Sequence, residues 1–236
     1  MALLETVSVV DALVQRLREQ VLDGVIPAGA AVAETDLAAE FGVSRPTAKS
    51  AIVTLVNGGL LRRDAHRSAY VPTLTPEDVA DIYRVRLPLE LEVVRTLATH
   101  ATVTPAIQAA FHELGALPDD VPTSRFIAAD LRAHRTLVEQ YGSPRLSRLY
   151  ESLLDEIHLC MIQSRWALGR ERIAHEHANV LEQIRCGDPE SATEAMRTHL
   201  QGACRALADA IALPTPEPRD SASEIAPTSS PLPNEP

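Results

Sequence analysis

Apolar residues recur with helical spacing through most of this chain. The first regular stretch is 7–23, where one face carries Val10, Leu13, Val14, Leu17 and Val21. Spacings of three and four residues predict an amphipathic helix that packs this face against a core. The glycines and the proline of 24–29 predict the turn that ends it.

The next stretch predicts two short helices separated by a tight turn. Residues 34–41 form the first helix, and Gly42 breaks it. Ser44 is placed to cap a second helix that runs to about Asn57. The second helix has an apolar stripe made of Ala48, Ile52, Leu55 and Val56. The polar side chains of its first turns, which suit a helix that enters the major groove of DNA, are Ser44, Arg45, Thr47 and Lys49.

Two short strands are predicted after this helix pair. The segments 60–63 and 69–71 each have the short apolar run of a strand, and the loop 64–68 joins them as a wing. No glycine stands between Gly59 and Gly115. The tip of the predicted wing is therefore stiff, because glycine is the residue that most readily adopts the conformations of a tight turn.

The remaining apolar pattern predicts a bundle of six helices. Helix starts are marked by a capping residue before a proline at Thr75, Thr104, Ser143 and Asp188. The predicted helices cover about 77–100, 105–115, 124–141, 144–168, 170–186 and 189–212. After Leu213 the residues are mostly proline, serine, threonine and acids, which predicts a disordered tail.

The expected fold class is therefore mainly α. A winged helix-turn-helix domain with three helices and a two-stranded wing occupies 1–73. An all-α bundle of six helices occupies 74–213. The disordered tail occupies 214–236.

Charge changes this picture locally. The chain of 236 residues has a net charge of −10, which taken alone argues against a nucleic-acid ligand. Between 44 and 67 the single acid is Asp64, and the cations are Arg45, Lys49, Arg62, Arg63 and Arg67. A compact patch of about +4 is typical of a small module that contacts phosphates. No apolar run approaches membrane-spanning length and no secretory leader opens the sequence, so a cytoplasmic protein without membrane contact is expected.

The order of these elements resembles the winged helix-turn-helix of the GntR family of bacterial transcription regulators, over about 7–73. The resemblance rests on LAAEFGVSR at 37–45 and GLLRR at 59–63. It implies contacts with double-stranded operator DNA from Ser44, Arg45, Thr47, Lys49, Arg62, Arg63 and Arg67. Two departures from the family pattern are Lys49, which stands where a forked arginine is usual, and the glycine-free wing. At that wing Arg67, with His66, is expected to contact the groove or only a phosphate.

A second constellation lies on the apolar faces of three predicted helices in the bundle. Asp130 and His134 are four residues apart, so they point to the same side of one helix. His177 and His199 lie on the apolar stripes of two later helices. A single such histidine is usually a satisfied core residue. Four inward-facing residues that can bind a metal together predict one divalent metal ion per chain. Zinc is the expected ion, and nickel, manganese, iron and cobalt are the alternatives.

This second pattern resembles the FCD-type (FadR C-terminal domain) ligand-binding domain of one branch of GntR regulators. The six short helices are similar to its VanR-like type, and the resemblance now spans about 7–210. It implies that a metal is bound by Asp130, His134, His177 and His199. A small organic acid is expected to reach this metal. Arg86 is its expected second anchor, and an ion pair of Arg86 with Glu90 or Glu92 is the equal alternative.

The expected function is a metabolite-responsive repressor. Two protomers pair through their helical domains, and each recognition helix reads one half of a palindromic operator. A small carboxylate at the metal pocket then releases or retunes the complex. Three alternatives remain: a regulator for which the ion itself is the signal, an activator, and a metal-dependent hydrolytic enzyme fused to a DNA-binding domain. An enzyme is not expected, because no separate general base or nucleophile stands beside the four ligands.

Overall fold

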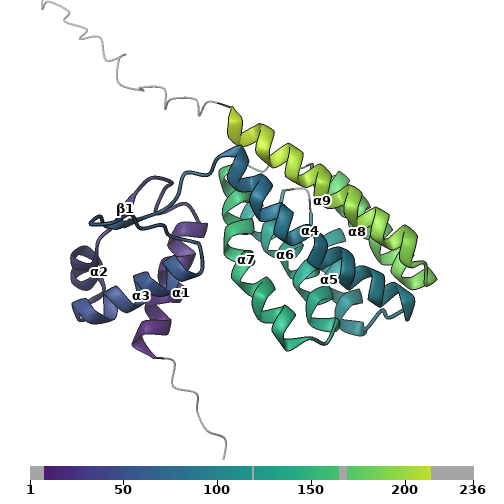
Figure 1. Cartoon of the computed structure of the whole chain (residues 1–236), viewed down its shortest axis with the longest axis horizontal. Coiled ribbons are helices and arrows are strands. Elements are labelled where there is room, and N and C mark those ends of the chain that lie inside the picture. Colours follow the sequence, from purple (N-terminus) through teal and green to yellow (C-terminus); the bar gives the residue numbers. More distant parts are fainter. Residues whose placement is uncertain (1–7, 119, 165–168, 214–236) are drawn as a thin grey trace, which may run out of the picture.

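The computed structural model describes residues 8–118, 120–164 and 169–213 and shows a mainly helical chain in two parts (Figure 1). We call residues 8–73 the reading head and residues 74–213 the bundle. The reading head contains α1 (Val9–Leu22), β1 (Ala31–Val32), α2 (Glu34–Phe41), α3 (Arg45–Asn57) and β2 (Ala69–Tyr70). The predicted fold class is confirmed in both parts. The predicted tail 214–236 lies outside the described residues.

The core of the reading head forms where α1 packs across α3. The buried side chains of α1 are Leu13, Val14, Leu17 and Val21, and those of α3 are Ala48, Ala51, Ile52 and Leu55. Each large aliphatic side chain buried here contributes about 1.5–3 kcal/mol. The predicted cap of α3 is confirmed, because the Ser44 hydroxyl accepts a hydrogen bond of 3.2 Å from the Thr47 amide.

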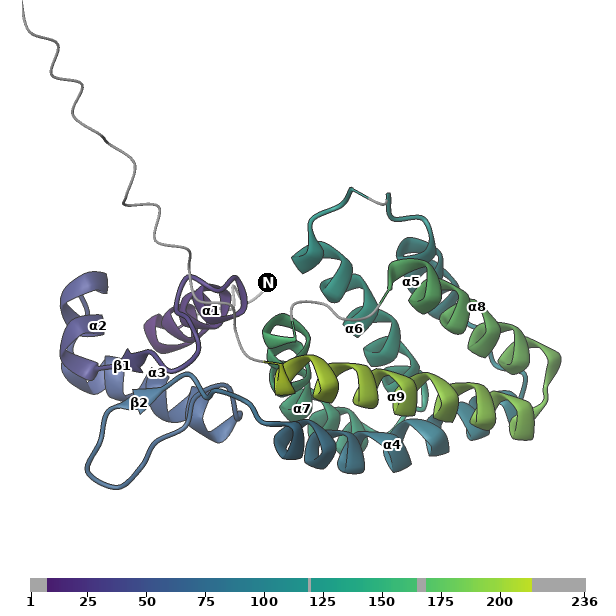
Figure 2. The same cartoon turned by 90° about the horizontal axis from the view of Figure 1, so that it is seen from above.

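The predicted pairing of the wing strands was wrong in one respect. The strand β2 pairs antiparallel with β1, and Ala31 lies opposite Tyr70. The segment 60–63 contributes an isolated bridge, in which Arg62 and Tyr70 exchange two backbone hydrogen bonds of 2.9 Å. Leu60 and the residue after it are fully buried, so this segment turns into the core before a ladder can extend. The loop 63–68 projects from the reading head, away from the bundle (Figure 2).

The bundle contains the six predicted helices. They are α4 (Pro76–Thr99), α5 (Pro105–Gly115), α6 (Thr123–Gln140), α7 (Pro144–Gln163), α8 (Arg170–Cys186) and α9 (Pro189–Ala212). The helix α4 runs along α9, and α8 packs against α9 and also contacts α4 (Figures 1 and 2). The helix α7 ends at Gln163, not at the predicted 168, and 165–168 lie outside the described residues. No helix in the described ranges is long and apolar enough to cross a membrane.

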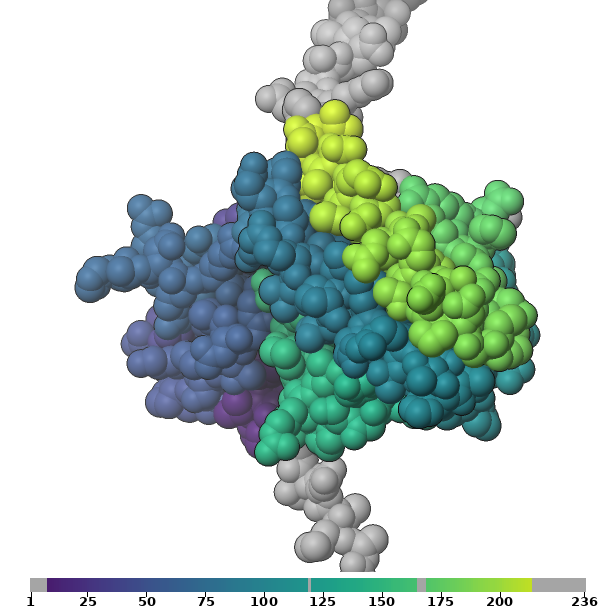
Figure 3. All heavy atoms as spheres, turned by 45° about the vertical axis from the view of Figure 1, so that its right-hand side comes forward, coloured from purple at the N-terminus to yellow at the C-terminus, as the bar shows by residue number. Residues whose placement is uncertain are grey.

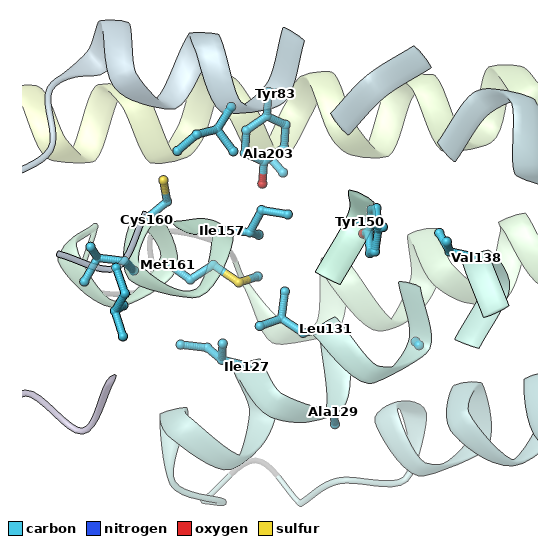
Figure 4. Close-up of a cluster of buried hydrophobic side chains, with 14 of the residues drawn as sticks. Tyr83, Ile127, Ala129, Leu131, Val138, Tyr150, Ile157, Cys160, Met161 and Ala203 are labelled. Atoms are coloured by element: carbon cyan, nitrogen blue, oxygen red, sulfur yellow. The ribbon is translucent and has the colours of Figure 1, made fainter. Parts of the chain in front are cut away.

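Side chains from four helices fill the centre of the bundle. Tyr83 of α4, Ile127 of α6, Ile157 of α7 and Ala203 of α9 meet in one apolar cluster (Figure 4). The predicted helix starts are confirmed, since the side chains of Thr75, Thr104, Ser143 and Asp188 each accept a hydrogen bond from a backbone amide three residues on. These caps fix where each helix begins and therefore which of its side chains face inward.

The reading head and the bundle meet in a contact that includes two ion pairs (Figure 3). Arg18 of α1 lies 2.8 Å from Asp155 of α7. Arg62 lies 2.6 Å from Asp78, which also completes the capping box of α4. The Gln163 amide clamps the linker, because it donates to the Pro72 carbonyl at 2.7 Å and accepts from the Leu74 amide at 2.9 Å.

We expect the substitution Gly59→Ala to destabilise the protein at this contact. Gly59 has φ +78°, and an added Cβ would lie 2.5 Å from the half-buried Glu156 side chain. The left-handed backbone alone costs a non-glycine residue about 1–2 kcal/mol. Gly42→Ala is the matched control, because its φ is +62° and nothing lies within 4 Å of its Cβ position. Urea unfolding should show a larger loss of unfolding free energy for Gly59→Ala, and equal losses would contradict this account.

Candidate metal centre and nucleic-acid interface

The structure brings the four predicted metal ligands together inside the bundle. Asp130 and His134 come from α6, His177 from α8 and His199 from α9, and all four are at most 3% exposed. One ligand atom from each lies within 4.8 Å of every other. The Nε2 atom of His134 is 3.1 Å from that of His177 and 3.2 Å from that of His199.

Each of the three imidazoles uses its other nitrogen for a hydrogen bond to a fixed acceptor. The Nδ1 atom of His134 lies 2.5 Å from the Glu90 carboxylate, and that of His199 lies 2.8 Å from Glu176. His177 Nδ1 lies 2.8 Å from the Ile173 carbonyl. A neutral imidazole that donates from Nδ1 presents a lone pair at Nε2. Three Nε2 lone pairs therefore converge on one point.

A cation at that point would resolve an otherwise unfavourable arrangement. Burial lowers the pKa of His134 and of His199 to about 4, so neither ring carries a second proton at neutral pH. Neutral rings in these tautomers have no hydrogen to place between their Nε2 atoms. Asp130 Oδ1 is also buried without a hydrogen-bond partner among the described residues, at 3.5 Å from His177 Nε2. An unpaired buried carboxylate oxygen is costly unless a cation or a donor meets it.

The spacing of the nitrogens suits a metal of the first transition row or zinc. Ligands about 2.0–2.1 Å from an ion are about 3.0 Å apart at right angles and about 3.3 Å apart in a tetrahedron. The observed 3.1 and 3.2 Å lie between these two values. The donor set of one carboxylate and three imidazoles is one that zinc and similar divalent ions accept. The residues present therefore fit a divalent metal.

Glu90 connects this cluster to a second buried group. Its Oε2 atom faces His134, and its Oε1 atom accepts from Arg86 Nε at 2.5 Å and from the Tyr150 hydroxyl at 2.6 Å. Burial raises the pKa of Glu90, but Arg86 and His134 outweigh it and hold that pKa well below its usual range. Glu90 is therefore ionised, and it neutralises Arg86.

Arg86, the predicted anchor for an acid, is 1% exposed. It makes the ion pair with Glu90 that the sequence offered as an alternative, and its Nη1 atom donates to the Tyr83 hydroxyl at 3.2 Å. Its Nη2 atom is buried and makes no hydrogen bond within the described part of the chain. Two unsatisfied polar atoms of opposite charge, this nitrogen and Asp130 Oδ1, thus remain beside the cluster.

Three residues of the site were not predicted from the sequence. Glu90 was considered there only as an ion-pair partner of Arg86, and Glu176 was given no role. Their contacts with His134 and His199 join different helices. Tyr150 gave no signal, because a tyrosine on an apolar helix face is ordinary in a core. The ligand ring was predictable from helical spacing, whereas the residues that orient it depend on tertiary packing.

We expect the metal-free protein to lose stability in acid. The pKa of His134 and of His199 is about 4 in the folded chain and about 6.5 in an unfolded one, so unfolding takes up protons below pH 6.5. These groups leave stability unchanged above pH 6.5 and reduce it as the pH falls towards 4. At pH 5 the loss is on the order of 2 kcal/mol per histidine. Urea unfolding of chelator-treated protein at pH 7 and at pH 5 measures this loss. The difference in unfolding free energy between the two pH values should be smaller for His199→Gln than for the unmodified protein.

The predicted DNA-contacting residues lie on the reading head, on the side of α3 and the wing. Ser44, Arg45 and Lys49 are exposed at the start of α3, and Thr47 is half-buried. A surface groove of about 310 Å³ brings Arg45, Arg63 and Arg67 together with residues of β1 and α2. Glu34 holds Arg63 in this groove at 3.2 Å. The groove can therefore receive an anion such as a DNA phosphate between the recognition helix and the wing.

Arg62 and His66 are placed differently from the rest of this set. Arg62 is tied to Asp78 of the bundle, so it lies at the contact between the two parts and not in the groove. His66 adopts φ 63° at the wing tip. Histidine is among the non-glycine residues that enter the left-handed region more often than others. The glycine-free wing therefore still makes a tight turn.

Comparison with protein families gives matches that together cover most of the chain. The FCD domain family matches residues 81–202, which is more than half of the chain. The family described as bacterial regulatory proteins, gntR family, matches residues 10–71. The first match contains all four candidate metal ligands and Arg86, and the second contains the seven candidate DNA contacts.

Individual relatives are regulators as well. The HTH-type transcriptional repressor NanR of Salmonella enteritidis is 30% identical over 199 residues, 71% of this chain and 72% of that protein. The HTH-type transcriptional regulator YdhC of Bacillus subtilis is 29% identical over 196 residues, 81% of this chain and 88% of that protein.

Two solved structures share the fold. A GntR transcriptional regulator from Rhodococcus sp. RHA1 has a TM-score of 0.74 at 22% identity and covers 84% of this chain and 96% of its own. McbR/YncC of E. coli has a TM-score of 0.69 at 20% identity, and the match covers 86% of this chain and 99% of that one. At these identities the likeness shows the fold alone.

Proposed function

Because the chain belongs to the GntR family of bacterial transcription regulators and carries an FCD domain, we propose that it is a repressor whose DNA binding is set by a small carboxylate at a metal ion. The protein is a regulator and not an enzyme, because the families and relatives that it matches are transcriptional regulators. The observation that carries the proposal is the convergence of three Nε2 lone pairs and an unpaired Asp130 oxygen in the bundle.

The metal is one divalent ion per chain, with zinc first and nickel, manganese, iron or cobalt as alternatives. It would be held by Asp130, His134, His177 and His199. When bound, such an ion supplies a Lewis-acidic position that can accept a carboxylate oxygen. Glu90, Glu176 and the Ile173 carbonyl fix the Nδ1 sides of the three imidazoles, so that each ring would turn its Nε2 atom to the ion.

A small anion is the ligand that fits the charge of this centre. A dication and one carboxylate leave a net charge of about +1, while Glu90 and Arg86 neutralise one another. Arg86 Nη2 has a hydrogen to donate and is the second anchor that we assign to the acid. A surface groove of about 230 Å³ between α5 and α8 has His177 in its wall and offers an approach to the centre.

The DNA-binding domain, which we assign to residues 1–73 and which contains the reading head, would contact operator DNA in the cytoplasm. The bundle, assigned to 74–213, would pair two protomers, so that two recognition helices meet the halves of a palindromic operator. The residues of the reading head that would contact the DNA are Ser44, Arg45, Thr47, Lys49, Arg63 and Arg67. Arg62, also predicted to contact DNA, would reach a phosphate only after leaving Asp78.

Selection of genomic fragments, followed by gel shifts, tests this function. Purified protein should retard a palindromic fragment in preference to scrambled DNA, and one member of a small carboxylate library should change that retardation. Addition of a chelator should abolish the effect of the acid. Absence of sequence-specific retardation under all conditions would refute the regulator. Release by metal removal alone, with no response to any acid, would assign the signal to the ion and refute the carboxylate.

A further inference from the structure

Glu90 is the point where the metal cluster touches the framework of the bundle. One of its oxygens faces His134 Nδ1 at 2.5 Å, and the other is shared by Arg86 and the Tyr150 hydroxyl. Glu90 belongs to α4 and Tyr150 to α7, so this carboxylate joins both helices to a ligand on α6. All three side chains in contact with Glu90 are buried.

The same two helices carry the ion pairs that hold the reading head. Asp78 lies twelve residues before Glu90 on α4, a distance of about 18 Å along the helix axis. It binds Arg62 at 2.6 Å. Asp155 lies five residues after Tyr150 on α7, about 8 Å along the axis, and binds Arg18 at 2.8 Å.

A change at Glu90 therefore has two routes to the reading head. One runs along α4 to the Asp78–Arg62 pair, and the other crosses the Tyr150 hydroxyl and runs along α7 to the Asp155–Arg18 pair. Because the Glu90 carboxylate is hydrogen-bonded to side chains of α6 and α7, a shift of this carboxylate would change how α4 sits against these helices. Both ion pairs would then be expected to adjust.

From this arrangement we infer that Glu90 is a positioning residue that orients His134 for the metal and passes metal occupancy to the reading head through α4 and α7. The inference rests on the proposed metal site and adds its regulation. In a loaded centre the His134 Nε2 lone pair would be directed at the ion, because Glu90 fixes the Nδ1–H tautomer and the ring plane. The position of Glu90 then differs between loaded and empty protein.

The test uses the full-length chain, Zn²⁺ as the probe, and three variants. Glu90→Gln weakens the orienting contact, and Tyr150→Phe removes only the hydroxyl that links Glu90 to α7. Glu92→Gln is the matched control, since Glu92 lies on the same helix but is only partly buried and pairs with Arg95. Calorimetry gives Zn²⁺ affinity, Co²⁺ absorption reports the ligand field, and hydrogen exchange follows the amides of 9–22 and 60–71.

We expect Zn²⁺ to slow exchange in both reading-head segments of the unmodified protein and of Glu92→Gln. Glu90→Gln should bind Zn²⁺ about 10–100-fold more weakly and give a shifted Co²⁺ spectrum. Tyr150→Phe should keep its Zn²⁺ affinity within about threefold, yet lose at least half of the protection in 9–22.

Four outcomes would overturn the inference. Unmodified protein that binds Zn²⁺ without any change of exchange in the reading head removes the coupling and leaves the metal site standing. Full protection of 9–22 in Tyr150→Phe removes the route through α7. Unchanged affinity and Co²⁺ spectrum in Glu90→Gln remove its positioning role. Unmodified protein that binds no Zn²⁺ removes the metal site and the inference together. Should Glu90→Gln fail to fold, because Arg86 would be left unpaired, Tyr150→Phe still decides the coupling.

Discussion

Protein with Asp130→Ala or His199→Ala is expected to retain no zinc after dialysis against a weak chelator. Each substitution removes one of four converging donors, and Asp130→Ala also removes the single negative charge among them. The unmodified protein should instead hold about one ion per chain. At a free metal concentration one hundred times the dissociation constant, binding stabilises the fold by about 2.7 kcal/mol. For a chain of this length that corresponds to a rise in Tm of about 5–11 °C.

Elemental analysis and thermal unfolding with and without added Zn²⁺ measure this effect. His175→Ala is the control, because His175 is exposed on α8, two residues from the ligand His177. It should bind metal as the unmodified protein does and show the same rise in Tm. Metal content that stays near one ion per chain in both Asp130→Ala and His199→Ala would remove these residues from the site.

Loss of operator binding is the second large effect that we expect, from Arg45→Ala. Arg45 is exposed at the first position of α3 and also lines the groove that holds Arg63 and Arg67. An arginine at the start of a recognition helix can contact a base edge and a phosphate. Removal of such a contact costs about 1–3 kcal/mol, which is about a 5–150-fold loss of affinity.

Titrations at several salt concentrations separate the two parts of this contact. Lys49→Ala should weaken specific and non-specific DNA similarly and flatten the salt dependence, whereas Arg45→Ala should reduce the preference for the operator. Arg84→Ala is the control, since Arg84 is an exposed arginine of the bundle, paired with Asp81. Equal affinities for Arg45→Ala and Arg84→Ala would place the DNA contact elsewhere on the reading head.

The convergence of the four candidate ligands could be predicted because each lies at a fixed step on a regular helix. The step of four residues between Asp130 and His134 sets their common direction whatever the helix packs against. The contact of Glu176 with His199 could not be predicted in this way, because it requires the crossing of α8 over α9. The helical period in the sequence predicts in which direction a side chain points. The residue that it contacts depends on how the helices pack.

The wing shows a similar limit at the level of the backbone. The strand β1 is two residues long, too short for an alternating pattern to reveal it. Its pairing with β2 depends on the Ala30 carbonyl, which accepts from the Val71 amide at 3.1 Å. The ion pair of Arg62 could not be predicted from the wing sequence either, because its partner Asp78 lies beyond the linker, in the bundle. Local sequence therefore predicted the wing as an element but not its partners.

The free energies of the ion pairs between reading head and bundle can be compared with the coupling free energy that a ligand supplies. Arg18 is about one-third exposed and Arg62 about two-fifths exposed, and pairs of this kind contribute about 0–1 kcal/mol each. Coupling between two binding sites in one protein is typically about 1–3 kcal/mol. Ion pairs this weak can therefore be reset by the binding of one small ligand. The orientation of the two reading heads in a dimer would then be a population that shifts with ligand, exchanging in microseconds to milliseconds.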